Sequence, residues 1–290
     1  MNSSSPVWLI TGAGTGFGNA ITLSALRRGH RVVATARRLS ALSDLAKAGA
    51  HALVLDVTAP EDDIAAKVKE AHGVYGRLDY LVNAAGYVLE SACEEASEKE
   101  VFDQFNTNVF GTIKLCRAVI PYFRAQSHGV IANFGSLASW NGSPATSFYN
   151  SSKWAVSGFT EALAAEVKGF GIDVTCIEPG MFRTAFLNAG KRTSSAIKMK
   201  DVYGNTGAAE YRAALDGANN AQRGDVVKGA EVVVDVVTKT GVAMGKEFPV
   251  RVALGPDTLS VVRSKCESTL ALMKEWEAVA ASTDHDDFKD

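Results

Sequence analysis

Apolar residues follow two different spacings along the chain, and stretches of one kind alternate with stretches of the other. Short continuous runs rich in Val, Ile and Leu are typical of strands that are covered on both faces. Longer stretches repeat their apolar residues at helical spacing. Strands are predicted at 7–11, 31–36, 52–55, 78–83, 130–134, 172–177 and 248–253, and helices at 17–28, 41–48, 60–74, 97–126, 147–168 and 227–240.

This alternation predicts a parallel sheet joined by right-handed helical crossovers. We therefore expect an α/β protein with a doubly wound Rossmann fold, a seven-stranded parallel sheet and helices on both faces. No internal repeat or long linker interrupts the pattern in the 290 residues. A single domain over 1–290 is the expected organisation.

Two segments depart from the alternation. Residues 185–225 are rich in Gly, Ala, Asn, Ser and Lys, have weak periodicity, and follow directly on a candidate binding turn at Pro179-Gly180. Flexible composition at that place predicts a lid over the substrate. The stretch 282–290 is polar and acidic, which predicts a disordered tail.

Composition favours small-molecule chemistry in a reducing compartment. The 30 basic and 32 acidic side chains nearly balance, which gives no support to a partner nucleic acid or a membrane surface. The N-terminus has neither the positive region nor the long apolar run of a signal peptide, and no run is long enough to span a bilayer. Four scattered cysteines show no metal spacing, and Cys116 and Cys176 are expected to be buried thiols. A soluble cytoplasmic protein without a metal is expected.

A glycine-rich turn follows the first predicted strand, where the sequence from Thr11 reads TGAGTGFG and enters a helix. Glycines permit a tight turn, a close approach of ligand to backbone, and close packing of helix on strand. Free N–H groups at the start of the helix favour a pyrophosphate. The spacing is GxxxGxG, so an ordinary strand-to-helix turn is the alternative. Contacts with a dinucleotide are expected from Gly12, Thr15, Gly16, Phe17 and Gly18.

The end of the second strand indicates which dinucleotide is bound. An acidic residue about 20 positions beyond the glycines would hold the ribose 2′-OH of NAD, but here the strand ends in Ala36-Arg37-Arg38. A guanidinium suits a 2′-phosphate, so Arg37 predicts NADP(H), unless both arginines are simply solvated. Asp56 and Val57 end the third strand and are expected near the adenine; Asp56 could equally cap a turn.

Tyr149 and Lys153 lie four residues apart in a predicted helix, which places both side chains on one face. A nearby ammonium stabilises a phenolate, so it is expected to lower the pKa of Tyr149 into a range useful for acid–base catalysis. Lys153 could also hold the cofactor ribose. Taken alone, this spacing is frequent by chance, and a surface pair is the alternative.

Two further polar residues strengthen this interpretation. Ser136 follows the fifth strand, at the sheet edge where ligands of open α/β sheets bind, and its hydroxyl could bind a substrate oxygen. Asn108 lies in the middle of a long predicted helix, where asparagine is unfavourable. It predicts a local kink and a bound water that connects Lys153 with solvent.

Together these motifs closely resemble those of the classical short-chain dehydrogenases/reductases over about residues 7–184, and more weakly to about 255. The resemblance implies that Tyr149 is the general acid/base, Lys153 its pKa-lowering and ribose-binding partner, Ser136 the substrate-oxygen binder and Asn108 the relay residue. It also implies a homodimer or homotetramer. On the cofactor side the matching residues are Asn83, Gly86, Pro179, Gly180 and Thr184. The second position of the family's NNAG is Ala84 here, a common variant.

The stretch ATARRLSAL (34–42) also resembles 17β-hydroxysteroid dehydrogenase-like and microbial oxidoreductases, without identifying a steroid as substrate. Aromatic and apolar residues near the motifs predict a pocket for a small hydrophobic, aromatic or secondary-metabolite ketone or alcohol. Core packing is the alternative for about half of them. Substrate contacts are expected from Ser136, Trp140, Tyr149 and Phe182.

Other functions remain open at this point. Gly135-Ser136-Leu137-Ala138-Ser139 is not GxSxG, which disfavours a serine hydrolase. A regulator that senses NADP(H) could dispense with Tyr149 or Ser136, yet both are present. An epimerase or dehydratase on the same scaffold is the more serious alternative.

Overall fold

The computed structural model describes residues 5–188 and 190–285. Seven strands form one sheet in the order β3-β2-β1-β4-β6-β7-β9, and every neighbouring pair is parallel. The predicted doubly wound sheet is confirmed. The strands are β1 (Val7–Thr11), β2 (Arg31–Ala36), β3 (His51–Val54), β4 (Tyr80–Asn83), β6 (Gly129–Phe134), β7 (Ile172–Pro179) and β9 (Arg251–Leu254).

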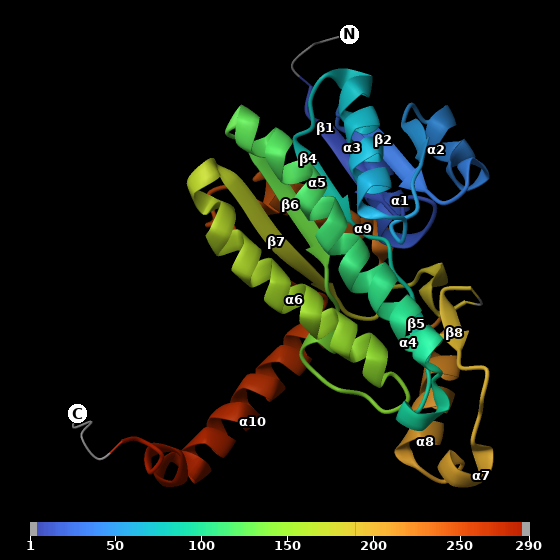
Figure 1. Cartoon of the computed structure of the whole chain (residues 1–290), viewed down its shortest axis with the longest axis vertical. Coiled ribbons are helices and arrows are strands. Elements are labelled where there is room, and N and C mark those ends of the chain that lie inside the picture. Colours follow the sequence, from blue (N-terminus) through green and yellow to red (C-terminus); the bar gives the residue numbers. More distant parts are fainter. Residues whose placement is uncertain (1–4, 189, 286–290) are drawn as a thin grey trace.

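Two hydrophobic cores, one on each face, explain the continuous apolar strands. All five residues of β1 are buried. One face is covered by α3 (Glu61–Tyr75), α5 (Gly111–Gln126) and α6 (Ser147–Val167), which cross the front of the sheet in Figure 1. The other face is covered by α1 (Gly16–Arg27), α2 (Ser43–Lys47) and α9 (Val226–Thr238). The buried thiols of Cys116 and Cys176 belong to the first face and to a small cluster beside α6, as expected.

The long helix predicted over 97–126 is divided by a π-helical turn. It consists of α4 (Glu98–Phe105), η3 (Asn106–Phe110) and α5. Ser97 begins α4 with a capping box, in which its hydroxyl accepts from Glu100 N and the Glu100 carboxylate accepts from Ser97 N. The expected kink at Asn108 is present as the π turn, a feature that is frequent at functional sites.

Several elements were not predicted. A second, two-stranded parallel sheet pairs β5 (Val88–Glu90) with β8 (Arg192–Ser194). Two short helices, α7 (Lys200–Tyr203) and α8 (Gly207–Ala218), follow β8 inside the stretch where a lid was predicted. These elements gather beyond one end of the main sheet, at the lower right of Figure 1.

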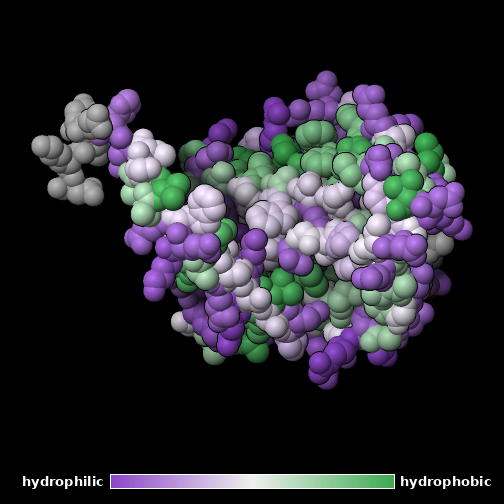
Figure 2. All heavy atoms as spheres, turned by 90° about the horizontal axis from the view of Figure 1, so that it is seen from below, coloured by the Kyte–Doolittle hydropathy of each residue, from purple (hydrophilic) through white to green (hydrophobic). Residues whose placement is uncertain are grey.

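The other unpredicted element is the 26-residue helix α10 (Pro256–Ala281), which begins with proline directly after Gly255. It projects from the body of the protein at the lower left of Figure 1, and apolar side chains are visible on the projecting part in Figure 2. Only Thr258 of this helix is buried. Of the predicted tail, 282–285 follows α10, and 286–290 lies outside the described residues. No helix within the described ranges is long and apolar enough to cross a membrane.

Candidate active site

The glycine-rich turn packs so tightly that side chains are excluded from two of its positions. Gly12 has a φ of +64°, and a Cβ there would lie 2.8 Å from Ala85 Cα. A Cβ at Gly18 would lie 2.6 Å from Gly12 O, because α1 rests directly on the turn. The start of the twelve-residue helix α1 is thereby fixed at the carboxyl end of β1 with its N–H groups facing outward.

A first cavity of ≈170 Å³ lies beside this turn. It is bounded by the carboxyl ends of β1, β6 and β7 and by the first turns of α6. The structure brings most of the predicted site together here, namely Gly12, Thr15, Gly16, Phe17, Gly86, Ser136, Tyr149, Lys153, Pro179, Gly180, Phe182 and Thr184.

Tyr149 and Lys153 sit one turn apart on α6, and both are buried. Lys153 Nζ donates to Phe134 O at 2.7 Å and lies 5.9 Å from the centre of the Tyr149 ring. No carboxylate pairs with Lys153 within the described part of the chain. Burial therefore lowers the pKa of Lys153 to about 8.

The pKa of Tyr149 differs from the sequence-based expectation, because burial raises it to about 12 in the protein without ligands. The neighbouring Ser136 hydroxyl acts in the opposite direction but is outweighed. Desolvation of the phenolate thus exceeds any stabilisation by Lys153. The proton accordingly stays on the Tyr149 hydroxyl at neutral pH.

Ser136 lies between β6 and a short 3₁₀ turn, η4 (Leu137–Ser139). Its hydroxyl oxygen accepts from Ala138 N at 3.1 Å, which fixes the side chain at the N-terminus of η4. Ser139, one turn later, donates to Lys153 O at 3.0 Å and thereby ties η4 to α6. The Ser136 hydroxyl is therefore held at the cavity next to Tyr149.

Asn108 contacts the site from the π turn. Its amide nitrogen donates to Tyr87 O at 3.0 Å and to Ser152 Oγ at 3.1 Å, while its oxygen accepts from Tyr87 N at 3.2 Å. A Cβ on Gly86 would lie 3.2 Å from the Asn108 oxygen and 3.7 Å from Lys153 Nζ. Asn108 and Lys153 thus meet at Gly86, whereas the predicted water relay stays a prediction.

Trp140 does not line the cavity, contrary to the expected substrate contact. Its indole N–H donates to Glu178 at 2.7 Å, and the guanidinium of Arg251 lies 3.8 Å from its ring centre. Glu178 is fully buried and also binds Arg251 and Ser157. Trp140 is near Ser136 in sequence, but the hydrogen bond to Glu178 holds its ring away from the lining of the cavity.

Asn83 also lies apart from both cavities. It is buried, and its amide nitrogen donates to Asn133 at 2.9 Å, between β4 and β6. This hydrogen bond joins the strand ends that carry the site, while the side-chain oxygen of Asn83 has no hydrogen-bond partner among the described residues, and its contact with a cofactor stays a prediction. Its neighbours Ala84, Ala85 and Gly86 do line the cavities.

A second cavity of ≈610 Å³ adjoins the first and shares Gly12, Thr15, Gly86 and Lys191 with it. Arg37, Asp56 and Val57 line it, as predicted for the adenosine half of a dinucleotide. Asp56 also accepts from Thr58 N at 2.9 Å, so it caps a turn as well. Arg37 is exposed at the rim.

Lys191 and Gln222 are among the lining residues that the sequence did not predict. Lys191 borders both cavities, and burial lowers its pKa, followed in importance by the positive charge of Arg37. Gln222 borders the first cavity, is 5% exposed, and its side-chain oxygen finds no hydrogen-bond partner among the described residues. Both belong to the stretch 185–225, whose weak periodicity gave no signal for a particular position.

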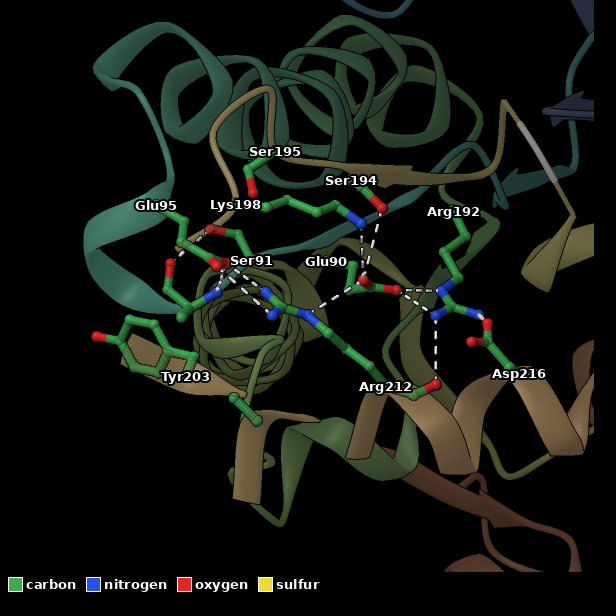
Figure 3. Close-up of polar contacts among 12 residues, drawn as sticks. Glu90, Ser91, Glu95, Arg192, Ser194, Ser195, Lys198, Tyr203, Arg212 and Asp216 are labelled. Atoms are coloured by element: carbon green, nitrogen blue, oxygen red, sulfur yellow. Dashed lines mark hydrogen bonds and ion pairs between the residues drawn. The ribbon is translucent and has the colours of Figure 1, made fainter. Parts of the chain in front are cut away.

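The stretch that carries these residues is fastened by four charged side chains, which we call the ion-pair cluster: the buried carboxylates of Glu90 and Glu95 and the mostly buried guanidinium groups of Arg192 and Arg212. Glu90, on β5, lies between Arg192 and Arg212 in Figure 3 and binds Arg192 Nε at 2.5 Å and Arg212 Nε at 3.3 Å. Arg212 also pairs with Glu95. Because Arg212 lies on α8, the cluster places Tyr211 and Leu215 of that helix against the first cavity. Whether this stretch moves as a lid stays a prediction.

Comparison with known proteins places this site in a family. The model of the short chain dehydrogenase family matches residues 6–194. The chain belongs to the short-chain dehydrogenase/reductase family. An oxidoreductase of this kind, BOA17 of Botryotinia fuckeliana, is 32% identical over 281 residues, covering 96% of this chain and 98% of its own length. A 3-ketodihydrosphingosine reductase of Bacteroides thetaiotaomicron is 41% identical over 61% of this chain and 64% of its own.

Solved structures agree with the family assignment. A short-chain dehydrogenase from Streptomyces avermitilis is 36% identical with a TM-score of 0.87, covering 98% of this chain and all of that one. A family member from Burkholderia phymatum in complex with NAD (22% identical, TM-score 0.77, 94% and 96% covered) shares the fold. A gluconate 5-dehydrogenase from Burkholderia cenocepacia, in complex with NADP and tartrate, is 26% identical with a TM-score of 0.60 over 63% and 74%. Proteins of this fold therefore bind either nicotinamide cofactor.

Proposed function

We propose that this short-chain dehydrogenase/reductase transfers a hydride between NADP(H) and a carbonyl or secondary alcohol of a small hydrophobic substrate. The observation that carries the proposal is the convergence of Tyr149, Ser136 and Lys153 on an apolar cavity that continues to the glycine-rich turn. Each of the three residue types supplies one requirement of carbonyl reduction: a proton, a hydrogen bond to the reacting oxygen, and a cation.

The residues present fit a dinucleotide. Gly12 and Gly16 line the first cavity without a side chain, so the backbone of the turn is open to a close ligand there. An ammonium has three N–H donors, and Lys153 uses one of them for Phe134 O. Because Lys153 lines the first cavity, its remaining donors suit the ribose hydroxyls of a bound cofactor. When bound, the nicotinamide supplies or accepts the hydride.

In the direction of reduction, Tyr149 gives its proton to the substrate oxygen. The raised pKa keeps that proton on the hydroxyl until the oxygen becomes basic. Ser136 donates a hydrogen bond to the same oxygen and stabilises the charge that develops there. In the direction of oxidation, Tyr149 accepts the proton from the alcohol, and a positive charge nearby is then needed to lower its pKa. Lys153 is the cation positioned for that task.

The preference for NADP(H) rests on two cations that face one cavity. Arg37 lies at the rim of the second cavity, and Lys191 lines both the second and the first cavity. Burial, and after it the positive charge of Arg37, lowers the pKa of Lys191, and the negative charge of a bound phosphate would favour its protonated form. We assign Arg37 to the 2′-phosphate and Lys191 to the neighbouring pyrophosphate.

The substrate cavity is mainly apolar, with Val88, Phe186 and Leu215 among its walls and the unpartnered oxygen of Gln222 as a polar feature. We infer a ketone with a hydrophobic body and one hydrogen-bond donor that reaches Gln222. The substrate in the name of the Bacteroides relative, 3-ketodihydrosphingosine, is also a ketone and serves as a comparison in the screen. The homodimer or homotetramer and the cytoplasmic location stay predictions.

A screen of NADPH oxidation over ketones, quinones and aldehydes, including 3-ketodihydrosphingosine, tests the function. We expect turnover with at least one apolar ketone and none with the Tyr149→Phe variant. Product formation without a net change in NADPH absorbance would instead support an epimerase or dehydratase. Tight NADPH binding without any conversion would support a sensor.

A further inference from the structure

The C-terminal helix α10 is attached to the body of the protein through its first two turns, where Thr258 is buried and Val261 and Val262 are half-buried. Asp257 accepts from Met181 N at 2.6 Å, and Thr258 donates to Leu254 O at 3.3 Å. Further along the helix, the hydroxyls of Ser268 and Thr269 donate to Lys265 O within the helix itself. All residues from Arg263 to Ala281 are exposed, so about 28 Å of helix projects into solvent. Because most helical stability in proteins comes from packing of an apolar face, this part of the helix is expected to pack against another surface.

An apolar stripe runs along this projecting helix. Leu259, Val262, Cys266, Leu270 and Met273 follow one another at intervals of three or four residues, the spacing of a seam between two helices. Trp276 and Ala280 extend the stripe toward the tip. The side chain of Met273 is 62% exposed and that of Trp276 is 55% exposed. A row of large apolar side chains in water is unfavourable and typically marks an interaction surface. The stripe therefore has the form of a helix-packing surface.

Charged residues beside the stripe indicate which partner fits it. Arg263, Glu267, Lys274 and Glu277 lie along one flank and read plus, minus, plus, minus. Reversing the helix gives minus, plus, minus, plus, so two copies in antiparallel orientation place opposite charges together along the whole flank. In two parallel copies this flank would face the other flank of the partner helix, so its charges would not meet their own reversed pattern. Leu270 lies midway between Arg263 and Glu277 and would sit at the centre of the antiparallel pair.

We propose that α10 pairs antiparallel with α10 of a second copy of this chain, about a two-fold axis at Leu270. A two-fold axis uses the same surface of both copies, which agrees with a charge pattern that complements its own reverse. The tip of each helix then reaches the base of the other. At that base Asp257 holds the turn after Pro179-Gly180, so the pairing braces one wall of the active-site cavity in each copy.

Disulfide trapping distinguishes the two orientations. Leu270→Cys is made in a Cys93→Ser, Cys266→Ser background, which removes the two exposed thiols. Mild oxidation is expected to give a covalent dimer that is abolished by reductant. The matched control keeps Cys266 and Leu270 and replaces only Cys93, and it is expected to stay uncrosslinked because antiparallel helices separate the two Cys266 residues. A dimer linked through Cys266 would overturn the proposal in favour of parallel helices.

Charge reversal tests the flank. Arg263→Glu and Glu277→Arg should each raise the dimer dissociation constant, measured by sedimentation equilibrium, by about tenfold, because each places like charges together twice. The double variant restores opposite charges and should return to within about threefold of the unaltered protein. Circular dichroism and NADPH binding are expected to stay unchanged in all three, since these residues lie outside the cavities. Equal dissociation constants for all variants, or a monomer at every concentration, would overturn the proposal.

Discussion

Two places in this protein bury positive charge, and they treat it in opposite ways. In the ion-pair cluster, Arg192 and Arg212 are surrounded by the carboxylates of Glu90 and Glu95, so each buried charge has a counter-charge. In the catalytic centre, Lys153 is equally buried but meets only a backbone carbonyl. The loss of hydration is therefore compensated by carboxylates in the ion-pair cluster, whereas no carboxylate compensates it at Lys153.

The difference separates structural charges from functional ones. In the ion-pair cluster the charges already bind one another and are not available to a ligand, and these ion pairs hold β5, β8 and α8 together. The ammonium of Lys153 has no counter-charge, so its hydrogen-bond donors and its charge stay available to a ligand. Its pKa of about 8 reflects the unfavourable burial of that charge. Lys191 resembles Lys153 in this respect, because it also lacks a carboxylate in the described residues. The same criterion therefore assigns both lysines to ligand binding.

The largest expected effect is the loss of turnover in the functional region. Tyr149→Phe removes the proton that the buried hydroxyl holds and should lower kcat by a factor of about 10²–10⁴ or more. The dissociation constant for NADPH, measured by fluorescence, should change little. Lys153→Met is expected to impair both quantities. A Phe variant that kept more than a tenth of kcat would assign the proton to another group.

Next in size is a loss of stability in the structural region. Arg212→Met leaves Glu95 and Glu90 buried with one counter-charge fewer, which should lower the free energy of unfolding by about 3–5 kcal/mol. The matched control is Lys47→Met, which removes the exposed pair with Asp44 and should cost less than about 1 kcal/mol. Urea denaturation of both variants measures the difference. Similar losses in the two would show that the cluster is not compensated as described.

A smaller effect separates the two phosphate-facing cations. Arg37→Asp should weaken NADPH binding by about 10- to 100-fold, corresponding to the 1.5–3 kcal/mol of a charged hydrogen bond, and leave NADH nearly unaffected. Lys191→Met should weaken NADPH and NADH alike, because both cofactors carry the pyrophosphate. Lys69→Met, at an exposed lysine that lines neither cavity, serves as the control. An effect of Lys191→Met on NADPH alone would move Lys191 to the 2′-phosphate.

The smallest effect is a dependence of stability on pH. The pKa of Lys153 is about 8 in the folded protein and 10.5 as a free group, so above pH 8 the unfolded chain binds more protons than the folded one. The contribution of Lys153 to unfolding free energy should therefore rise between pH 8 and 10, by at most about 1.4 kcal/mol per pH unit. Urea midpoints of the unaltered protein and of Lys153→Met, compared at both pH values, isolate it. An identical pH slope in the two proteins would contradict the uncompensated burial of Lys153.

The sequence predicted the parts of the site that depend on local signals. Strand runs, the glycine turn and the spacing of Tyr149 and Lys153 are encoded over a few residues, and the structure brings them together at one cavity. The position of the Trp140 ring could not be predicted, because nearness in sequence says nothing about which way a ring turns, and its partner Glu178 is 38 residues away. Lys191 and Gln222 were missed because long-range contacts of the ion-pair cluster, not local periodicity, fix the stretch that carries them.

The pairing of β5 with β8 has a consequence for the order in which the protein folds. Glu90 and Arg192 are 102 residues apart in the chain, so their contact closes a long loop whose entropy is lost before the ion pairs form. The main sheet can form its parallel pairs without β8, whereas β8 has only the three-residue β5 to pair with. We therefore expect the α8 wall of the substrate cavity to form late during folding and to separate early during unfolding. Under mild denaturant this wall would separate first, while the glycine turn and its helix stay folded.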